Sequence, residues 1–437
     1  MSQFSTPAVS DAIYDASSLG RPRMFLLGLQ HLFAMFGATV LVPVLTGLSV
    51  SATLLFAGLG TLLFHFLSRG KVPAFLGSSF AFIAGYAAIA PNGEAELLPY
   101  ACLGVACAGL LYPVLAALFR AFGAKRVMRF FPPVVTGPIV ISIGLILASS
   151  AIANCQTNWL VAVVAVAVIV VCNIWGRGMV KIVPILLGVV VSYAVAAALG
   201  EVDFSGVAAA PWVGLPIVWD NTVFDSGLAT TAIITIMPLA FATMIEHIGD
   251  ISAIGSTCER NYIADPGLHR TLLGDGFATI LASLFGAPAN TTYGENTGVL
   301  ALTRVFDPRV IRIAACCAIV LSFCPKFAAV IAAMPACVIG GVSLVLYGMI
   351  SAVGVRNLIE NQVDFQNNRN VLVAALVLVL SLGIAYSTAG AIVLELGGVT
   401  ISLSGLAVGS LVGIVLNAIL PGNDFEFDTS ELEEAAK

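Results

Sequence analysis

One polar run interrupts the apolar segments of this chain: Asn290-Thr291-Thr292-Tyr293-Gly294-Glu295-Asn296-Thr297-Gly298. Its Glu295 needs an explanation, because a charged side chain near the centre of a bilayer costs about 2.5–3.5 kcal/mol on insertion scales. Pro288 and the two glycines predict that the backbone here is partly unwound. Unwound backbone at membrane depth is tolerated only where protein or water covers it, and broken segments of this kind indicate a transporter's binding site.

The composition of the whole chain agrees with a membrane protein. The 437 residues are 59% apolar and only 10% charged, and the mean hydropathy is +1.02. This excludes an ordinary soluble domain and favours an all-α polytopic membrane protein. The first residues are polar and lack the apolar core of a signal peptide, so we expect a short cytoplasmic tail over 1–22. The nine cysteines have no paired spacing and predict apolar packing rather than a disulfide or metal site, and no cofactor is expected.

Apolar windows long enough to cross a bilayer, about 20 residues each, recur along both halves of the chain. In the first half they fall near 23–43, 51–68, 98–120, 132–153, 157–176 and 180–200, with a shorter, interrupted window at 74–91. In the second half they fall near 228–254, 268–286, 309–332, 335–354, 369–387 and 400–421, with a short broken window at 288–303. The sequence therefore predicts 14 transmembrane segments, with extended stretches in segments 3 and 10.

The positions of the basic residues give the predicted orientation. Lys and Arg collect in cytoplasmic loops. With the N-terminus inside, all 19 Lys and Arg residues except Lys326 fall on the cytoplasmic side. We therefore expect a multi-pass protein of the cytoplasmic (inner) membrane with both termini in the cytoplasm.

The two halves also resemble each other. The stretch 29–32, Leu-Gln-His-Leu, resembles 245–248, Ile-Glu-His-Ile, and 78–80, Ser-Ser-Phe, resembles 291–293, Thr-Thr-Tyr. The matches keep the same order in both halves, which indicates a duplication. Because each unit has an odd number of spans, the copies are predicted to be inverted repeats of seven segments.

Four carboxylates fall at membrane depth in this topology: Glu246, Asp250, Asp275 and Glu295. Glu246 and Asp250 are spaced i, i+4 and share one face of a helix. We interpret Glu246 and Glu295 as functional residues. Asp275, between two glycines, fits either a structural hydrogen bond to a neighbouring helix or a functional role.

Two histidines accompany these carboxylates. His247 follows Glu246 but is turned about 100° away from it on the helix. His31 on the first span fits a helix-to-helix hydrogen bond better than a proton carrier, and both readings stay open. No P-loop, dinucleotide fingerprint, Ser/His/Asp set or metal-ligand spacing occurs, so we expect neither an enzyme nor nucleic-acid binding.

The two broken windows supply hydrogen-bond donors. Where 79–80 and 293–294 are extended, their N–H groups lack helical acceptors and are free to bind the carbonyl oxygens of a ligand. Phe80 and Tyr293 place an aromatic ring beside these amides, although packing alone also explains Phe80. Carboxylate acceptors, amide donors and an aromatic wall suit a neutral planar heterocycle, such as a pyrimidine base.

Several stretches are similar to the nucleobase/ascorbate transporter family, also called nucleobase:cation symporters, and within it to the bacterial uracil permeases. The similarity covers roughly 24–420 and rests on 30–39, 73–82 and 290–296. The family signature, an acidic or amide residue, Asn, any residue, Gly, four residues, Thr and a basic residue, reads here as Glu295-Asn296-Thr297-Gly298 and Thr303-Arg304.

This resemblance implies a division into domains. A core domain (23–130 and 228–332) would carry the substrate in an elevator movement against a gate domain (131–227 and 333–421). The gate domain would form a homodimer, and 422–437 would be an acidic cytoplasmic tail.

The resemblance also implies roles for individual residues. Glu246 and Glu295 would bind substrate, Phe80 and Gly294 would offer backbone amides, and Tyr293 would line the site. The candidates for proton coupling are Glu246, Asp250, His31 and Asp275.

One position departs from the uracil-transporting pattern. Asp250 stands where the uracil type has a histidine, and it resembles the purine-transporting branch, as does Asp275. Glu295, in place of the glutamine typical of xanthine and urate carriers, favours uracil.

The sequence therefore predicts a proton-coupled importer of uracil, with uracil, protons and membrane lipid as its partners. The alternative within the family is a carrier of xanthine, hypoxanthine or guanine. A passive channel or anion exchanger of the same fold belongs to another class, and the membrane carboxylates argue against anion exchange because they repel anions. An intramembrane enzyme is not supported, since no nucleophile lies beside a base.

Overall fold

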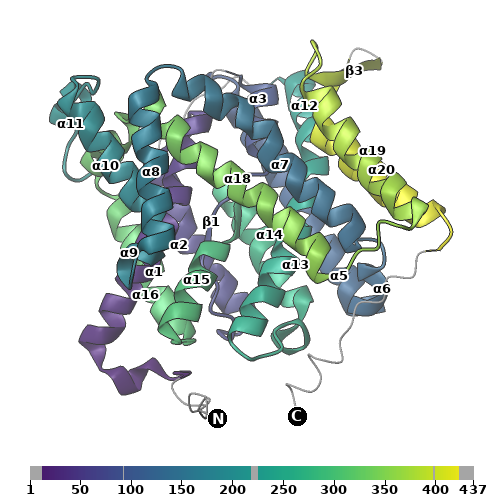
Figure 1. Cartoon of the computed structure of the whole chain (residues 1–437), viewed down its shortest axis with the longest axis horizontal. Helices are drawn as coiled ribbons and strands as arrows, with labels where there is room; N and C mark the ends of the chain where they lie inside the picture. The colour runs from purple at the N-terminus through teal and green to yellow at the C-terminus, as the bar shows by residue number, and fades with distance from the viewer. Residues whose placement is uncertain (1–11, 92, 218–224, 397–398, 423–437) are drawn as a thin grey trace, which may run out of the picture.

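The computed structural model describes residues 12–91, 93–217, 225–396 and 399–422 and is mostly helical (Figure 1). Residues 1–11 of the expected N-terminal tail, and all of the expected acidic tail except Gly422, lie outside the described residues. The first half contains α1 (Arg21–Thr46), α2 (Val50–Leu67), β1 (Leu76–Ser78), α3 (Ile83–Ile89), α4 (Leu98–Gly109), α5 (Leu111–Phe122), α6 (Ala124–Met128), α7 (Pro133–Cys155), α8 (Trp159–Trp175), α9 (Met179–Ile182), α10 (Pro184–Ala198) and α11 (Ser205–Ala209).

The second half follows a similar order. It contains α12 (Ser226–Ile236), α13 (Ala240–Thr257), α14 (Leu268–Leu284), β2 (Asn290–Thr292), α15 (Gly294–Thr303), α16 (Pro308–Ser322), α17 (Pro325–Ala332), α18 (Ala336–Glu360), α19 (Asn368–Ala385), β3 (Ala391–Leu396), β4 (Val399–Ser404) and α20 (Gly405–Ile419). Three short turns of helix, η1 (Ala16–Leu19), η2 (Met237–Leu239) and η3 (Ile263–Gly267), connect longer elements.

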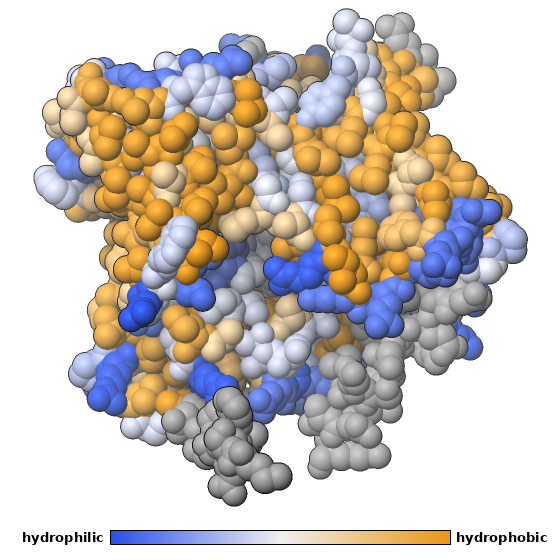
Figure 2. Space-filling model, viewed as in Figure 1, coloured by the Kyte–Doolittle hydropathy of each residue, from blue (hydrophilic) through white to orange (hydrophobic). Residues whose placement is uncertain are grey.

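Many of the helices are apolar enough to cross a membrane. Among the described residues, seven helical segments reach spanning length, when α4 with α5 and α12 with α13 are each counted as one segment. The number is eight if the bent pair α16 and α17 is one span, and α8, α10 and α20 are shorter apolar helices. Figure 2 shows apolar residues over most of the visible face, with hydrophilic residues gathered along its upper edge and lower part. The other predicted spans fall on shorter or broken elements, so the 14-segment topology and the inverted repeats stay predictions.

Two details differ from the sequence analysis. The window 309–332, expected as one span, is broken into α16 and α17 at an angle of 87°; Pro325, which lacks an N–H donor, begins the second helix. The antiparallel hairpin of β3 and β4 was not predicted. Two β-branched runs on either side of Gly397-Gly398 were its sequence signal.

The helices pack in two neighbourhoods. In one, α7 lies along α18, α8 packs on α10 and α18, and α19 packs on α20 and α7. In the other, α2 packs on α14 and α16, α14 also contacts α4 and α5, and α1 packs on α16. The strands β1 and β2 belong to the second neighbourhood. The assignment of these neighbourhoods to a core and a gate domain stays a prediction.

A two-stranded sheet joins the halves of the chain at the centre of the second neighbourhood. β1 and β2 are antiparallel, with Leu76 opposite Thr292 and Ser78 opposite Asn290. Thr61 on α2 accepts a hydrogen bond from the Leu76 N–H (2.9 Å) and donates one to the Leu76 carbonyl (3.2 Å). Extended backbone is thereby supplied with partners in an apolar interior, where an unpaired polar group is costly. The extended stretches predicted in the two broken windows are therefore observed.

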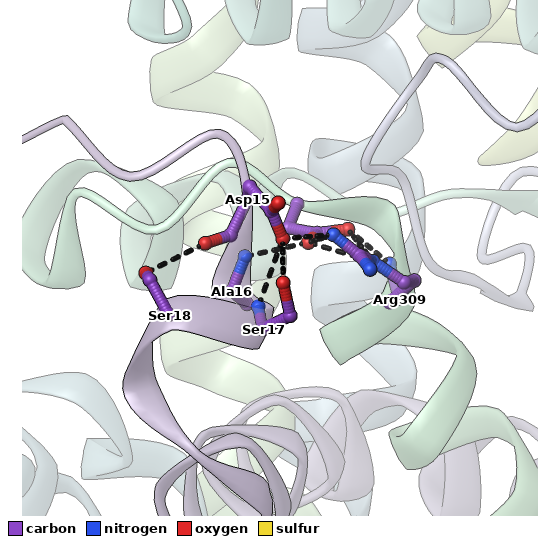
Figure 3. Close-up of polar contacts among 6 residues, drawn as sticks. Asp15, Ala16, Ser17, Ser18 and Arg309 are labelled. Atoms are coloured by element: carbon purple, nitrogen blue, oxygen red, sulfur yellow. Dashed lines mark hydrogen bonds and ion pairs between the residues drawn. The ribbon is translucent and has the colours of Figure 1, made fainter.

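The described part of the N-terminal tail is not free. We call residues 13–17, together with Asp307 and Arg309, the N-terminal clasp. Ile13 accepts a backbone hydrogen bond from Phe306 (2.8 Å) and donates one to Arg304 (2.8 Å). Arg309 pairs with both Asp15 and Asp307, and the Ala16 N–H donates to Asp307 (2.7 Å) (Figure 3). The clasp fixes the start of the chain to the loop between α15 and α16.

The hydrogen bonds of the clasp shift the pKa values of its charged groups. Hydrogen bonds from the Ser17 hydroxyl and N–H, followed by the Arg309 side chain, lower the pKa of Asp15. Burial acts to raise the pKa of Asp307, but the hydrogen bonds from Arg309 and Ala16 outweigh it, and the pKa is lowered. Hydrogen bonds from Asp307 and Asp15 raise the pKa of Arg309. All three groups are therefore held in their charged forms.

Candidate functional site: carboxylates and free amides at a strand-to-helix junction

The ends of β1 and β2 leave two backbone amides without partners. The Ser79 N–H donates to Ala289 (2.9 Å) and the Tyr293 N–H donates to Phe75 (3.0 Å). The sequence analysis expected the amides of Ser79 and Tyr293 to be free. This expectation was wrong, because each of these amides extends the pairing of β1 with β2 by one further hydrogen bond. The next amides, those of Phe80 and Gly294, have no acceptor within the described residues.

Gly294 begins α15, and no side chain of the described residues caps this helix. The N-terminus of a helix carries unsatisfied N–H groups and a partial positive charge. Glu295 follows as the second residue of the helix. The junction therefore offers a donor and an acceptor on adjacent residues.

Three carboxylates meet in front of this junction. Glu246 and Asp250 lie on α13, which packs on both α15 and β2. A Cβ on Gly294 would lie 3.8 Å from Asp250 Oδ1. Glu246 and Glu295 are close enough for their charges to interact, and Asp250 interacts with both. The structure thus brings together carboxylates from segments 45 residues apart in sequence.

The space in front of these carboxylates is open. Gly249 lies three residues after Glu246, and Gly298 lies three residues after Glu295, so each glycine shares a helix face with its carboxylate. Both glycines are exposed, and apart from their own helix no atom of the described residues lies within 4 Å of the position that a Cβ would occupy. Glu246, Asp250 and Glu295 are themselves only partly buried. This face is therefore accessible to a ligand.

Phe80 is half-buried and points toward a helix of the other neighbourhood. Its ring meets that of Tyr347 on α18 edge to face, with centroids 6.2 Å apart and an interplanar angle of 79°. Tyr347 was not predicted, because a tyrosine in an apolar helix carries no sequence signal of its partner.

Tyr293 makes structural contacts, and its expected role in lining the site stays a prediction. Its side chain is buried, its hydroxyl donates to the Ser78 carbonyl (2.9 Å), and the Thr39 hydroxyl lies 3.3 Å away. The ring covers Gly77, where a Cβ would lie 2.5 Å from two ring atoms. In this structure Tyr293 therefore fastens the two strands together.

His31 makes a contact between helices. Its Nδ1 lies 3.1 Å from Asn296 Nδ2, and its carbonyl oxygen accepts from the same group at 3.2 Å. Asn296 is on α15, next to Glu295. His31 thus makes a hydrogen-bond contact between α1 and α15, which is one of the two roles that the sequence analysis left open for it.

Asp275 on α14 is fully buried behind the site. Its Oδ2 lies 3.4 Å from Nδ1 of His247, which is also fully buried. The same Nδ1 lies 3.4 Å from the Thr292 hydroxyl, which donates to Asp250 Oδ2 at 2.8 Å. His247 and Thr292 were not among the predicted site residues, because His247 points away from Glu246 and its partner lies on another helix. Within the described part of the chain, no group of three or more His, Cys, Asp or Glu side chains is arranged to hold a metal ion.

Comparisons of the sequence with known proteins find similarity to permeases. The model of a family described as the permease family matches residues 22–390. The uracil permease of Bacillus caldolyticus is 41% identical over 420 residues, covering 94% of this chain and 94% of that protein. The uracil permease of Escherichia coli (strain K12) is 40% identical over 404 residues, covering 90% of each.

Solved structures extend the comparison to the fold alone. The transmembrane domain of the cyanobacterial bicarbonate transporter BicA superposes with a TM-score of 0.63 at 14% identity, covering 92% of this chain and 98% of that one. The murine anion transporter Slc26a9 in the inward-facing state superposes with a TM-score of 0.65 at 12% identity, covering 95% of this chain and 73% of that one. The matches to the permease family and to the uracil permeases, together with the apolar helices, identify a multi-pass membrane transporter rather than an enzyme. The chain belongs to the nucleobase/ascorbate transporter family of permeases.

Proposed function

We propose that this protein is a symporter that imports uracil together with protons across the cytoplasmic membrane. The relatives named uracil permease, which match over nearly the whole chain, support a uracil carrier. The observation that carries the proposal is the combination of two free amides with a group of carboxylates at one accessible junction.

Uracil is complementary to this junction. It carries carbonyl oxygens, which accept hydrogen bonds, and N–H groups, which donate them. The amides of Phe80 and Gly294 would donate to its carbonyls, while Glu246 and Glu295 would accept from its N–H groups. Hydrogen bonds to a carboxylate are roughly twice as strong as those between neutral groups, so the carboxylates would dominate affinity.

The same carboxylates support proton coupling. Among the described residues, no lysine or arginine forms an ion pair with Glu246, Asp250 or Glu295. Uracil is neutral and brings no cation to the site. Moving several uncompensated carboxylates away from water is costly. A proton taken up with the substrate would remove one of these charges during transport.

We further propose that the two helix neighbourhoods are the core and gate domains and that substrate crosses by an elevator movement between them. Phe80 on one side and Tyr347 on the other would meet at the interface that slides. The gate helices would also form the homodimer, and both termini would lie in the cytoplasm.

A purine base is the second candidate. Asp250 holds Thr292 in a hydrogen bond beside the site, whereas the uracil-transporting pattern has a histidine at this position. Larger purine substrates would need the open space in front of Gly249 and Gly298.

Uptake into proteoliposomes tests both proposals. With labelled uracil and a panel of unlabelled bases, we expect competition by uracil and not by xanthine, hypoxanthine or guanine. With an imposed pH gradient, acidic outside, we expect uracil to accumulate and the accumulation to collapse with a protonophore. Accumulation that follows sodium and ignores the pH gradient would overturn the proton coupling, and preferential competition by a purine would overturn the choice of uracil.

A further inference from the structure

The least accessible charged group near the site is Asp275. Its side chain is fully buried, and neither carboxyl oxygen forms a hydrogen bond within the described residues. The nearest partner is His247 Nδ1 at 3.4 Å, and Nε2 of the same ring has no hydrogen-bond partner in the described part of the chain. A carboxylate in such a place is strongly destabilised unless a proton or a cation neutralises it. A carboxylate beside a neutral imidazole ring has a net charge of −1. The pair of Asp275 and His247 therefore becomes neutral only when it binds one additional proton.

A hydroxyl connects this pair to the binding site. Thr292 donates its only hydroxyl proton to Asp250 at 2.8 Å. Its oxygen is left to accept from the ring of His247, which lies 3.4 Å away. Asp250, Thr292, His247 and Asp275 thus form an unbroken series of polar groups. The series leads from a partly exposed carboxylate to one with no contact to solvent.

We propose that Asp275 and His247 form a second, buried proton-binding site, which exchanges one proton with Asp250 through the hydroxyl of Thr292. The proposal rests on the proposed proton coupling and adds a site and a route to it. In the loaded state the pair is neutral overall and shares one added proton between Asp275 Oδ2 and His247 Nδ1, which lie 3.4 Å apart. In the empty state it is a neutral imidazole beside the Asp275 carboxylate.

The transfer needs no other reactant. The proton on His247 Nδ1 moves to Thr292 Oγ1 while the hydroxyl proton of Thr292 moves to Asp250 Oδ2. One N–H bond and one O–H bond break, and two O–H bonds form. The pair loses one proton, Asp250 gains one, and Thr292 is unchanged. The hydrogen bond from Thr292 to Asp250 already points in the direction of this transfer.

Among the described residues, no cation competes for the proton of this pair. The charged groups that act on Asp275 are Glu246 and Asp250 on α13, and the hydroxyl of Tyr112 on α5 is engaged with Thr243 at 2.6 Å. On the side of α2, the ring of Phe64 meets that of His247 at 74°. Phe64 thus covers the ring of His247 on this side, and the side chains of both His247 and Asp275 are fully buried. The pair would hold a proton inside the protein while Asp250 faces water, which limits loss of the proton before substrate moves.

The neighbouring residue provides a matched control for Thr292. Thr291 is equally buried on the same strand, but its hydroxyl has no hydrogen-bond partner within the described residues. We would compare the wild type, Thr292→Val and Thr291→Val in proteoliposomes. The measurements are pH-gradient-driven uracil accumulation, uracil counterflow at equal pH, and proton entry reported by a trapped pH dye.

We expect Thr292→Val to lower gradient-driven accumulation by about tenfold, which is less than the roughly 10²–10⁴-fold that a positioned proton-transfer group contributes to a rate, while counterflow persists. Thr291→Val should accumulate uracil as the wild type does. His247→Gln should reproduce the loss and change the pH dependence of uptake. Gradient-driven accumulation by Thr292→Val equal to that of Thr291→Val would overturn the relay while leaving the proposed function intact. A wild type that ignores the pH gradient would overturn both.

Discussion

The hydroxyl of Tyr293 donates to the backbone carbonyl of Ser78 at 2.9 Å, across the junction where the two halves of the chain meet. The ring that carries this hydroxyl lies on Gly77 of the opposite strand. One side chain therefore fixes the distance between the two amides of the candidate site, because Phe80 follows Ser78 by two residues and Gly294 follows Tyr293 directly. The geometry of the candidate site therefore depends on a contact that does not itself need to touch a ligand.

Removing this contact gives the first prediction. Tyr293→Phe should leave the buried Ser78 carbonyl without this donor, at a cost of about 1–3 kcal/mol. We expect a lower melting temperature of the purified protein and weaker uracil binding. Tyr262→Phe is a suitable control, because Tyr262 is also buried, lies beyond the end of α13, and has a hydroxyl with no hydrogen-bond partner among the described residues. A Tyr293→Phe protein with the stability and affinity of the wild type would exclude this role for the hydroxyl.

Glu295 is predicted to be essential for binding. Glu295→Gln removes the anionic acceptor and presents an amide N–H where the base needs an acceptor, so affinity should fall by about tenfold or more. Equilibrium binding to purified protein measures this directly. Glu360→Gln, on an exposed glutamate at the end of α18, should bind normally. Unaltered affinity in Glu295→Gln would remove Glu295 from the site.

Phe80 tests the role of a backbone amide. Phe80→Pro removes the N–H and should abolish uptake, whereas Phe80→Tyr keeps the N–H and the ring and should retain uptake. Surface expression and thermal stability must be measured for both proteins. A correctly inserted and active Phe80→Pro carrier would show that this amide does not bind the ligand.

Asp250 is predicted to separate binding from coupling. Asp250→Asn keeps a hydrogen-bond acceptor for Thr292 but can no longer gain or lose a proton. Uracil binding should persist, while accumulation driven by a pH gradient should fall by about tenfold or more. Asp250→His should shift the preference further toward uracil in the competition panel. A change in neither coupling nor preference would reduce Asp250 to a structural residue.

The N-terminal clasp predicts a pH-dependent stability. Hydrogen bonds lower the pKa of Asp15 and, against the effect of burial, the pKa of Asp307. A carboxyl whose folded-state pKa is lowered stabilises the fold fully above its unfolded value, about 4, and the contribution disappears as pH falls through the folded-state value. Asp307→Asn should therefore melt at a lower temperature than the wild type at neutral pH. Its free energy of unfolding should be lower by about 1–2 kcal/mol.

The difference between the wild type and Asp307→Asn should vanish in acid, below the folded-state pKa of Asp307. Arg309→Gln should behave in the same way, and Arg356→Gln, on an exposed arginine of α18, should not. Melting curves from pH 7 downward test the sign. A difference that grows as the pH falls would contradict the assigned charge states.

Local patterns in the sequence were sufficient for part of this structure. The polar run at 290–298 predicted extended backbone, and Glu246 and Asp250 were expected on one helix face, where they lie. The sequence did not show that the sheet uses the amides of Ser79 and Tyr293, because this depends on one extra hydrogen bond at each strand end. It also did not show that His247 faces Asp275, since helical periodicity gives the direction of a side chain but not what stands opposite it.

The pairing of β1 with β2 has a consequence for biosynthesis. The two strands are separated by about 210 residues, which a ribosome adds in about 10–40 s at roughly 5–20 residues per second. Throughout this interval the N–H and C=O groups of β1 lack their strand partner, although bare backbone is not tolerated in lipid. Thr61, already synthesised on α2, pairs with both polar groups of Leu76 and so provides a partner before the second half of the protein exists. β1 therefore cannot form its native strand pairing until translation has passed Thr292, and a chain that ends before that point lacks the partner strand.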